Sequence, residues 1–290
     1  DRTLPLAGAG GGSPPSITVF DPRLAGDEPS PLQPAGESPI VPRPSPPRTK
    51  TPPQPCIRAA PRYAARRMDA RLALVHEDDA LLVVNKPAGL VCHPTKADGY
   101  SSLISRVRLH LGPAAEPPQM VNRLDRETSG LVVVAKTAGA ARELRQLWES
   151  GAVTKRYLAI VHGVPQPAEG LIDAPLGKDE ASCVAIKDCV RPDGKPAQTH
   201  YRVQRSFRRE GRDFSRLEVT PRTGRKHQIR IHLAHAGHPI VGDKIYGGDE
   251  RLYLAFVEGR LDDAGWARLR LPCQALHAGE LAFPWRAAAL

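Results

Sequence analysis

Half of the prolines in this chain lie within its first 60 residues, and this uneven distribution limits which part of the chain can fold. Of the 30 prolines, 15 precede residue 61. Runs such as Pro42-Arg43-Pro44-Ser45-Pro46-Pro47 and Gly8-Ala9-Gly10-Gly11-Gly12 cannot alternate apolar and polar residues for long enough to bury one face. We therefore expect residues 1–67 to form a disordered proline- and glycine-rich segment, and residues 68–290 to form the folded domain.

The expected start of the folded domain coincides with a methionine. The chain begins with Asp1, whereas Met68 stands directly before the first strand-like pattern. We expect the functional protein to begin near Met68. The preceding segment contains acidic residues and no apolar core stretch, so it is typical of neither a secretory signal nor an organellar transit peptide.

Composition excludes several classes of protein. No apolar run reaches the roughly 18 residues of a membrane-spanning helix, so no membrane association is expected. The five cysteines include no C-x-x-C pair, which argues against a zinc ribbon or a disulfide scaffold and favours a reducing, cytoplasmic location. Coiled-coil heptads are absent, and we expect a monomer.

The positive charge lies mainly on the expected folded domain. Lys and Arg total 41 against 31 Asp and Glu, a formal net charge of +10. Residues 1–60 contribute only +1 of this. An excess of positive charge on a folded domain favours a polyanionic partner such as RNA or DNA, although an ordinary solvated basic surface would give the same balance.

Short apolar runs and helical spacings alternate irregularly after residue 70. Helices are predicted over 101–111, 137–148 and 226–236, the last ended by Gly237 at its C′ position. The predicted strands cover residues 72–75, 81–85, 131–135, 156–162, 199–206, 214–220 and 276–283. Because strands predominate and do not alternate regularly with helices, we predict an α+β fold and not a doubly wound one.

The densest polar cluster is the loop 121–130, which precedes an apolar strand. Arg123 and Arg126 flank Asp125, and the loop ends in Thr128-Ser129-Gly130. An aspartate beside cations is expected to stay ionised, which suits a nucleophile or an electrostatic stabiliser. An aspartate that only accepts hydrogen bonds from its own turn would show the same pattern, so spacing alone leaves both interpretations open.

Two further clusters carry groups capable of chemistry. The segment 223–232 brings four cationic or potentially cationic side chains into a predicted helix, where the guanidinium of Arg230 needs either solvent or a carboxylate. The strand start 155–159 places Tyr157 and Ala159 on one face. A tyrosine in a strand is most often a core residue with a satisfied hydroxyl, and that interpretation stands beside a functional one.

Together these segments resemble the RluA family of RNA pseudouridine synthases. The family's H-R-L-D-x-x-T-S-G loop is matched by residues 122–130. Further stretches agree in order, at 84–90, 155–159, 194–199, and 224–232 continuing into 237–243. The match covers residues 70–283. It implies a mixed, mainly antiparallel central sheet with flanking helices, a catalytic cleft across the sheet, and no metal or organic cofactor.

The resemblance also implies roles for individual positions. Asp125 falls on the catalytic aspartate, Tyr157 on the active-site tyrosine and Arg230 on the arginine that pairs with the aspartate. The substrate-binding positions fall on Arg123, Thr128 and Leu276. The implied function is isomerisation of uridine to pseudouridine in structured ribosomal or transfer RNA. Asp125 would attack ribose C1′, or else assist removal of a ribose proton through a glycal.

Two positions depart from the family's pattern. Asn122 replaces the usual histidine before R-L-D, and Lys226 stands where threonine or serine is commoner. Neither is one of the three catalytic positions, so they bear on the choice of substrate. The basic residues Arg205, Arg208, Arg209 and Arg212 either contact RNA phosphates or form a solvated hairpin tip.

Other functions fit the sequence less well. His227, His232, His235 and His238 lie close together, yet no carboxylate or cysteine completes a familiar zinc spacing, and we expect no metal site. Cys92 has no evident base nearby and is expected to be a packing residue. The alternative function is a catalytically inactive RNA-binding protein in ribosome assembly, which would have no need of the Asp125, Tyr157 and Arg230 set.

Overall fold

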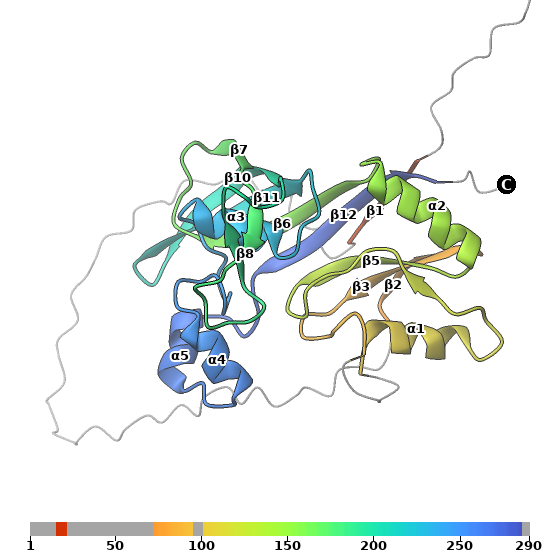
Figure 1. Ribbon diagram of the computed structural model, residues 1–290, viewed down its shortest axis with the longest axis horizontal. Helices are drawn as coiled ribbons and strands as arrows, with labels where there is room; N and C mark the ends of the chain where they lie inside the picture. The colour runs from red at the N-terminus through yellow and green to blue at the C-terminus, as the bar shows by residue number, and fades with distance from the viewer. Residues whose placement is uncertain (1–15, 22–71, 95–100, 286–290) are drawn as a thin grey trace, which may run out of the picture.

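The computed structural model describes residues 16–21, 72–94 and 101–285 (Figure 1). The helices are α1 (Leu103–Leu111), α2 (Ala138–Glu149), α3 (Gln228–His235), α4 (Arg251–Val257) and α5 (Asp263–Leu269). The strands are β1 (Ser16–Phe20), β2 (Leu74–Glu77), β3 (Leu81–Lys86), β4 (Gln119–Met120), β5 (Ser129–Ala135), β6 (Thr154–His162), β7 (Glu169–Asp173), β8 (Leu176–Lys178), β9 (Asp188–Val190), β10 (Gln198–Arg209), β11 (Arg212–Pro221) and β12 (Leu276–Pro284).

Most of these strands belong to one sheet. Its order is β2-β3-β5-β12-β6-β11-β10-β7, with β1 paired to β12 and β4 to β5. Strands β8 and β9 pair separately. Among the strands of the described residues, only β5 and β12 pair in parallel. The prediction of an α+β fold with a mixed, mainly antiparallel central sheet and flanking helices is therefore confirmed.

The parallel pairing of β5 with β12 depends on a glycine. Gly130 lies opposite Ala278 and has a φ of 118°. A Cβ atom at this position would lie 2.3 Å from the carbonyl oxygen of Ala278, which is too close for any other residue without movement of the backbone. The Thr-Ser-Gly end of the loop 121–130 thus fixes that loop beside the first residues of β12.

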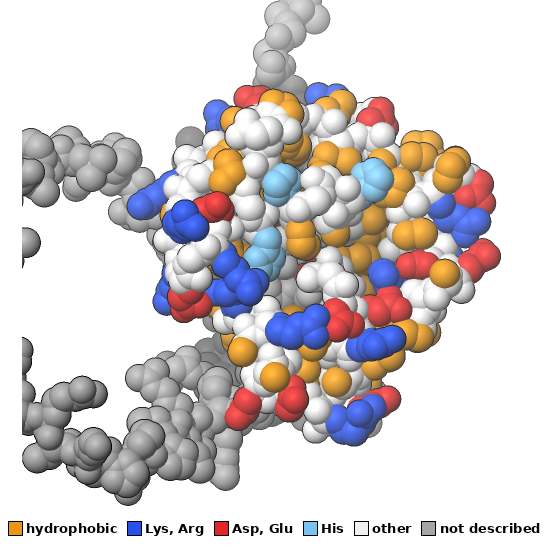
Figure 2. All heavy atoms as spheres, turned by 90° about the vertical axis from the view of Figure 1, so that its left-hand side faces the viewer, with side chains coloured by type: hydrophobic (Ala, Val, Ile, Leu, Met, Phe, Trp, Pro, Cys, Tyr) orange, Lys and Arg blue, Asp and Glu red, His pale blue; other side chains and the backbone are white. Residues whose placement is uncertain are grey.

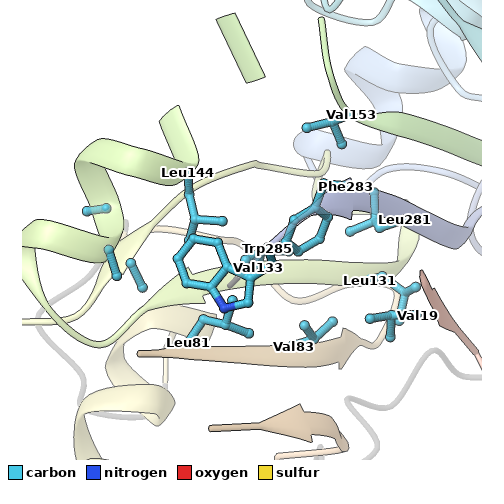
Figure 3. Close-up of a cluster of buried hydrophobic side chains, with 13 residues drawn as sticks. Val19, Leu81, Val83, Leu131, Val133, Leu144, Val153, Leu281, Phe283 and Trp285 are labelled. Atoms are coloured by element: carbon cyan, nitrogen blue, oxygen red, sulfur yellow. The ribbon is translucent and has the colours of Figure 1, made fainter. Parts of the chain in front are cut away.

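Strands β3 and β5 are buried on both faces, which explains why their sequences are continuous apolar runs. Helix α2 covers one face and α1 the other (Figure 1). On the α2 side, Leu81 and Val83 pack with Leu144 and with aromatic residues from the end of β12 (Figure 3). On the α1 side, Leu82 and Val84 pack with helix residues such as Val107.

Helix α2 begins at a side-chain cap. The hydroxyl of Thr137 accepts a hydrogen bond from the backbone N–H of Ala140, 3.2 Å away. We expect Thr137→Ala to lower the free energy of unfolding by about 1 kcal/mol, because this N–H group then loses its partner. Urea denaturation checks this, with Thr137→Ser as the control that retains the cap. A Thr137→Ala protein as stable as the control would show that the cap contributes nothing.

The helices predicted over 101–111, 137–148 and 226–236 correspond to α1, α2 and α3. Helices α4 and α5 were not predicted, since at seven residues each they are too short for a helical spacing to stand out. Of the helices in the described ranges, none combines the length and apolar character that crossing a membrane requires.

Strand β1 corrects the prediction that residues 1–67 are disordered, as far as residues 16–21 are concerned. It pairs with β12 along its whole length, and Val19 is buried in the same cluster as Phe283. Its sequence, Ser-Ile-Thr-Val-Phe, is rich in β-branched residues, but its composition was outweighed by the surrounding prolines. A domain boundary at Met68 therefore excludes a strand of the sheet. The rest of 1–67 lies outside the described residues.

Candidate active site

The six predicted site residues line one cavity of about 610 Å³. They are Arg123, Asp125, Thr128, Tyr157, Arg230 and Leu276. The sheet order explains why they meet. The loop 121–128 precedes β5, Leu276 starts β12 and Tyr157 lies on β6, and these three strands are neighbours in the order β5-β12-β6. Arg230 enters the cavity from the first turn of α3.

The loop that carries Asp125 is held by two buried lysines. Lys86 is fully buried, and its ammonium donates hydrogen bonds to the carbonyls of Leu90 and Arg126, at 2.9 and 3.2 Å. Burial lowers the pKa of Lys86 to about 8. Lys244 donates to both carboxylate oxygens of Glu127, at 2.7 and 2.8 Å. These bonds anchor Arg126 and Glu127, the two residues that follow Asp125, so the backbone that carries the Asp125 side chain is held in place.

Arg230 lies between two carboxylates. It donates through Nε and Nη2 to Asp243, at 2.7 and 2.9 Å, and through Nη1 to Oδ2 of Asp125 at 2.7 Å. Asp243 is fully buried, and its Oδ1 also accepts the backbone N–H groups of Ile245 and Tyr246. The bidentate pair with Asp243 fixes the plane of the guanidinium, and of the three N–H groups that remain, one on Nη1 donates to Asp125.

Burial and neighbouring charges shift the pKa values of Arg230 and Asp243 in opposite directions. Burial opposes the charge of Arg230, but Asp243 and Asp125 outweigh it and raise the arginine pKa. Burial likewise opposes the charge of Asp243, and Arg230 outweighs it and lowers that pKa. Asp125 is 30% exposed, against 6% for Arg230, so it is the solvent-facing end of the group. The interpretation of Asp125 as a residue that only caps its own turn is wrong, since its carboxylate binds α3.

Tyr157 and Leu276 form an apolar wall of the cavity. In the sheet, Tyr157 pairs with Ala278 of β12 and with Val219 of β11. Tyr157 packs against two clusters of the core and also lines the cavity, so the packing interpretation is confirmed and the functional one stays a prediction. Burial, and then the negative charge of Asp125, raise the pKa of Tyr157 to about 12, so its hydroxyl stays protonated at neutral pH.

Three residues of the loop that carries Asp125 differ in their exposure and hydrogen bonding. Arg123 is exposed at the cavity edge. Thr128 is buried, and its hydroxyl accepts a hydrogen bond from Gln274, so it also holds the loop. Asn122 uses its Oδ1 to accept the backbone N–H of Val133 at 2.8 Å. The asparagine that departs from the family's pattern is therefore engaged with strand β5.

Two of the four histidines considered for a metal site, His232 and His238, have other partners. His232 is buried between the hydroxyl of Thr199 and the carbonyl of Ala174, at 2.8 and 2.9 Å, and His238 lies 3.0 Å from the carbonyl of His162. Among the residues placed by the structure, no group of three or more His, Cys, Asp and Glu side chains is arranged to hold a metal ion.

Cys92 is buried, whereas the arginines of residues 205–212 are exposed. Cys92 is buried against the backbone of Leu124, and burial raises the pKa of its thiol, as expected for a packing residue. The arginines near 205–212 lie around the exposed β10–β11 hairpin tip. This position agrees with a solvated tip and also leaves them accessible to phosphates.

His227 was not predicted as a site residue, yet it lines the cavity. Its Nδ1 lies 2.9 Å from the hydroxyl of Tyr246, and its Nε2 lies 3.8 Å from Oδ1 of Asp125. Its side chain is 9% exposed. Burial, and then the charge of Arg230, lower the pKa of His227 from 6.5 to about 4.

This pKa predicts a dependence of stability on pH. Between pH 6.5 and about 4 the unfolded chain protonates His227 while the folded protein keeps it neutral. The unfolded state then binds more protons, so the free energy of unfolding falls as the pH decreases, by on the order of 2 kcal/mol from this residue. Urea denaturation at pH 7 and pH 5 measures the loss, and His227→Gln should show a smaller one. Equal losses in both proteins would contradict the assignment.

Comparison with known proteins identifies the family. A family model described as RNA pseudouridylate synthase matches residues 80–235, more than half of the 290 residues. The chain therefore belongs to the RNA pseudouridylate synthase family, and the resemblance noted in its sequence is confirmed. Asp125, Tyr157 and Arg230 all lie within the matched range.

Individual relatives agree with this assignment. Ribosomal large subunit pseudouridine synthase D of Vibrio cholerae is 40% identical over 217 residues, which cover 74% of this chain and 64% of the relative. The synthase of the same name from Haemophilus ducreyi is 38% identical over 182 residues, covering 62% and 54%. The chain thus spans less than two thirds of these relatives' length. The solved structure of human RNA pseudouridylate synthase domain containing 4 has a TM-score of 0.57 and 29% identity, covering 73% of this chain and 84% of that one.

Proposed function

We propose that this chain is an RNA pseudouridine synthase, an isomerase that converts uridine to pseudouridine, with Asp125 as its catalytic carboxylate. One observation supports this most strongly. Asp125 is paired with a buried arginine on one oxygen, while the side chain faces a cavity walled by Tyr157 and Leu276. A protein that only binds RNA has no use for a carboxylate, which repels phosphates, at the centre of its cavity.

The reaction requires little beyond these groups. The bond from ribose C1′ to uracil N1 breaks and a bond from C1′ to C5 forms, while C5 loses its proton and N1 gains one. Nothing is oxidised or hydrolysed. In this proposal Asp125 attacks C1′ or assists removal of a ribose proton, and Arg230 stabilises and aims the carboxylate. Tyr157, protonated at neutral pH, flanks the uracil and can assist proton movement at C5.

Binding the substrate requires the uridine to leave its stack, at a cost of a few kcal/mol. We propose that Arg123, which is exposed at the cavity edge, occupies the gap that the base leaves. Thr128 supports the loop, and Leu276 packs against the base. On the face shown in Figure 2 the lysine and arginine side chains lie among acidic ones, so the net charge of +10 forms no single patch there. We therefore expect RNA affinity to fall with salt through several dispersed contacts.

The relatives point to a substrate class. Those from Vibrio cholerae and Haemophilus ducreyi are named for the ribosomal large subunit, and we propose that this chain acts on large-subunit ribosomal RNA in the cytoplasm. Pseudouridine mapping of total RNA, from cells with and without the protein, tests both proposals. Sites that vanish in the deletion strain and return only with the wild-type gene would identify enzyme and substrate together.

The same experiment distinguishes the alternative function. If all sites persist in the deletion strain, and the purified protein binds ribosomal RNA without modifying it, the chain acts as an RNA-binding protein in ribosome assembly. If the sites that vanish lie in transfer RNA, the activity stands and the proposed substrate is wrong.

A further inference from the structure

His227 has an unusual backbone for a residue of its type. It stands immediately before α3 with φ 55° and ψ 15°, in the left-handed region. This conformation costs a non-glycine residue about 1–2 kcal/mol, because its Cβ approaches the backbone. Among the described residues only Glu210 and Arg270 share a positive φ without being glycine, and neither lines the cavity. With this backbone conformation the imidazole of His227 lies beside Asp125, its Nε2 3.8 Å from Oδ1.

The hydrogen-bond partners of His227 determine which ring nitrogen carries the proton. The backbone N–H of Asp188 donates to the Tyr246 oxygen at 3.2 Å. The hydroxyl proton of Tyr246 is then directed to Nδ1 of His227, 2.9 Å away. A neutral imidazole that accepts at Nδ1 carries its proton on Nε2. The opposite tautomer would turn an Nε2 lone pair toward the carboxylate of Asp125, which is unfavourable.

The carboxylate of Asp125 has an unused position that faces this proton. Arg230 donates a single hydrogen bond to Oδ2, which alone does not fix the rotation of the carboxylate about its Cβ–Cγ bond. Oδ1 lies 3.8 Å from Nε2 of His227. This distance exceeds a hydrogen bond, but a small rotation of the carboxylate closes it, and contacts of this kind commonly tighten when substrate fills a site.

We infer that His227 is a positioning residue: its Nε2–H donates to Oδ1 of Asp125 when the substrate is bound, and together with Arg230 it fixes the orientation of the carboxylate. Tyr246 acts through His227 by holding its tautomer, and its ring also lies 5.0 Å from the guanidinium carbon of Arg230. Two hydrogen bonds to two different oxygens leave one orientation, in which a lone pair of Asp125 points into the cavity. This inference rests on the proposed function.

The test uses two substitutions of His227. They separate the effect of side-chain length from the effect of the left-handed backbone conformation. Asparagine tolerates the left-handed conformation better than most residues, and its Oδ1 still accepts from Tyr246, but its side chain ends short of Asp125. Glutamine places an amide N–H near the position of the histidine Nε2. The exposed His235 on the same helix provides the matched control, His235→Asn.

The assay measures release of tritium from uracil C5 in an in vitro transcript of bacterial large-subunit ribosomal RNA, under single-turnover conditions with the full chain. We expect His227→Asn to slow release about 10- to 100-fold. Its RNA Kd and melting temperature should stay near wild type, and His227→Gln should recover most of the rate. Tyr246→Phe should slow release less, and adding it to His227→Asn should cause little further loss.

The outcomes are distinct. An undiminished rate for His227→Asn, or a His227→Gln protein as slow as His227→Asn, would overturn the positioning role. A loss of RNA binding in parallel with the rate would do the same, because it would place His227 in substrate binding. Should the wild-type chain release no tritium from this transcript, while Asp125→Asn behaves identically, the proposed activity on this RNA fails first.

Discussion

Asp125→Asn is expected to abolish pseudouridine formation while leaving the protein folded. Asparagine has nearly the same shape but no negative charge, so it can neither attack ribose C1′ nor stabilise positive charge that develops there. We expect the single-turnover rate to fall by at least about 10³-fold. Tritium release from C5-labelled RNA measures the rate, and mapping in cells that carry only the mutant gene measures the consequence.

The fold should tolerate this change. Arg230 keeps its bidentate bond to the fully buried Asp243, so removing the charge of Asp125 leaves no unpaired buried cation. RNA affinity should stay the same or rise slightly, because a carboxylate that repels phosphate is gone. Asp213→Asn is the matched control, since Asp213 is exposed in the β10–β11 hairpin. A mutant at Asp125 that retains more than a tenth of the wild-type rate would remove this residue from the chemistry.

Asp243→Ala is expected to produce the largest loss of stability. It leaves the guanidinium of Arg230 buried at 6% exposure with the cavity-facing Asp125 as its remaining carboxylate partner, and it removes the acceptor of two backbone N–H groups. Breaking a buried ion pair on one side typically costs about 3–5 kcal/mol. In a domain of this size we expect the melting temperature to fall by roughly 10 °C or more. Differential scanning calorimetry measures the shift.

Two further variants show how much of the stability lost in Asp243→Ala comes from the unpaired charge of Arg230. Asp193→Ala removes one of the two carboxylate partners of the exposed Arg191 and should lower the melting temperature much less than Asp243→Ala does. The double variant Arg230→Met with Asp243→Leu removes both charges and should be more stable than Asp243→Ala alone. If Asp243→Ala were no less stable than Asp193→Ala, the buried pair would not be a determinant of stability.

The sequence predicted the site more fully than it predicted the network around it. Asp125, Tyr157 and Arg230 could be placed because each stands in a motif of the family. The need of Arg230 for solvent or a carboxylate was also evident from its position. The choice of Asp243 could not be derived, since the rest of α3 and the turn after it separate Arg230 from Asp243 in the chain. A G-D-K-x-Y-G pattern containing Asp243 and Tyr246 was the available signal.

The fold was predictable where the pattern is local. Alternation and apolar runs identified the strands β3, β5 and β6, and a threonine cap identified the start of α2. Strand β1 was missed because its stability depends on pairing with β12, at the opposite end of the described chain. His227 was missed because a left-handed backbone is uncommon even for histidine, so the residue type alone does not predict that conformation.

The central place of β12 has a consequence for how the protein matures. This strand joins β5 to β6, yet it follows all the other strands in the described sequence. During synthesis from the N-terminus, β5 and β6 are made before β12. Each can already pair with its other neighbour, β3 or β11, but the edge that faces β12 stays unpaired until residues 276–284 are made. The long sequence separation makes this pairing slow. The two walls of the cavity therefore meet only after β12 has paired with β5 and β6, so the cavity cannot form before residues 276–284 have been synthesised.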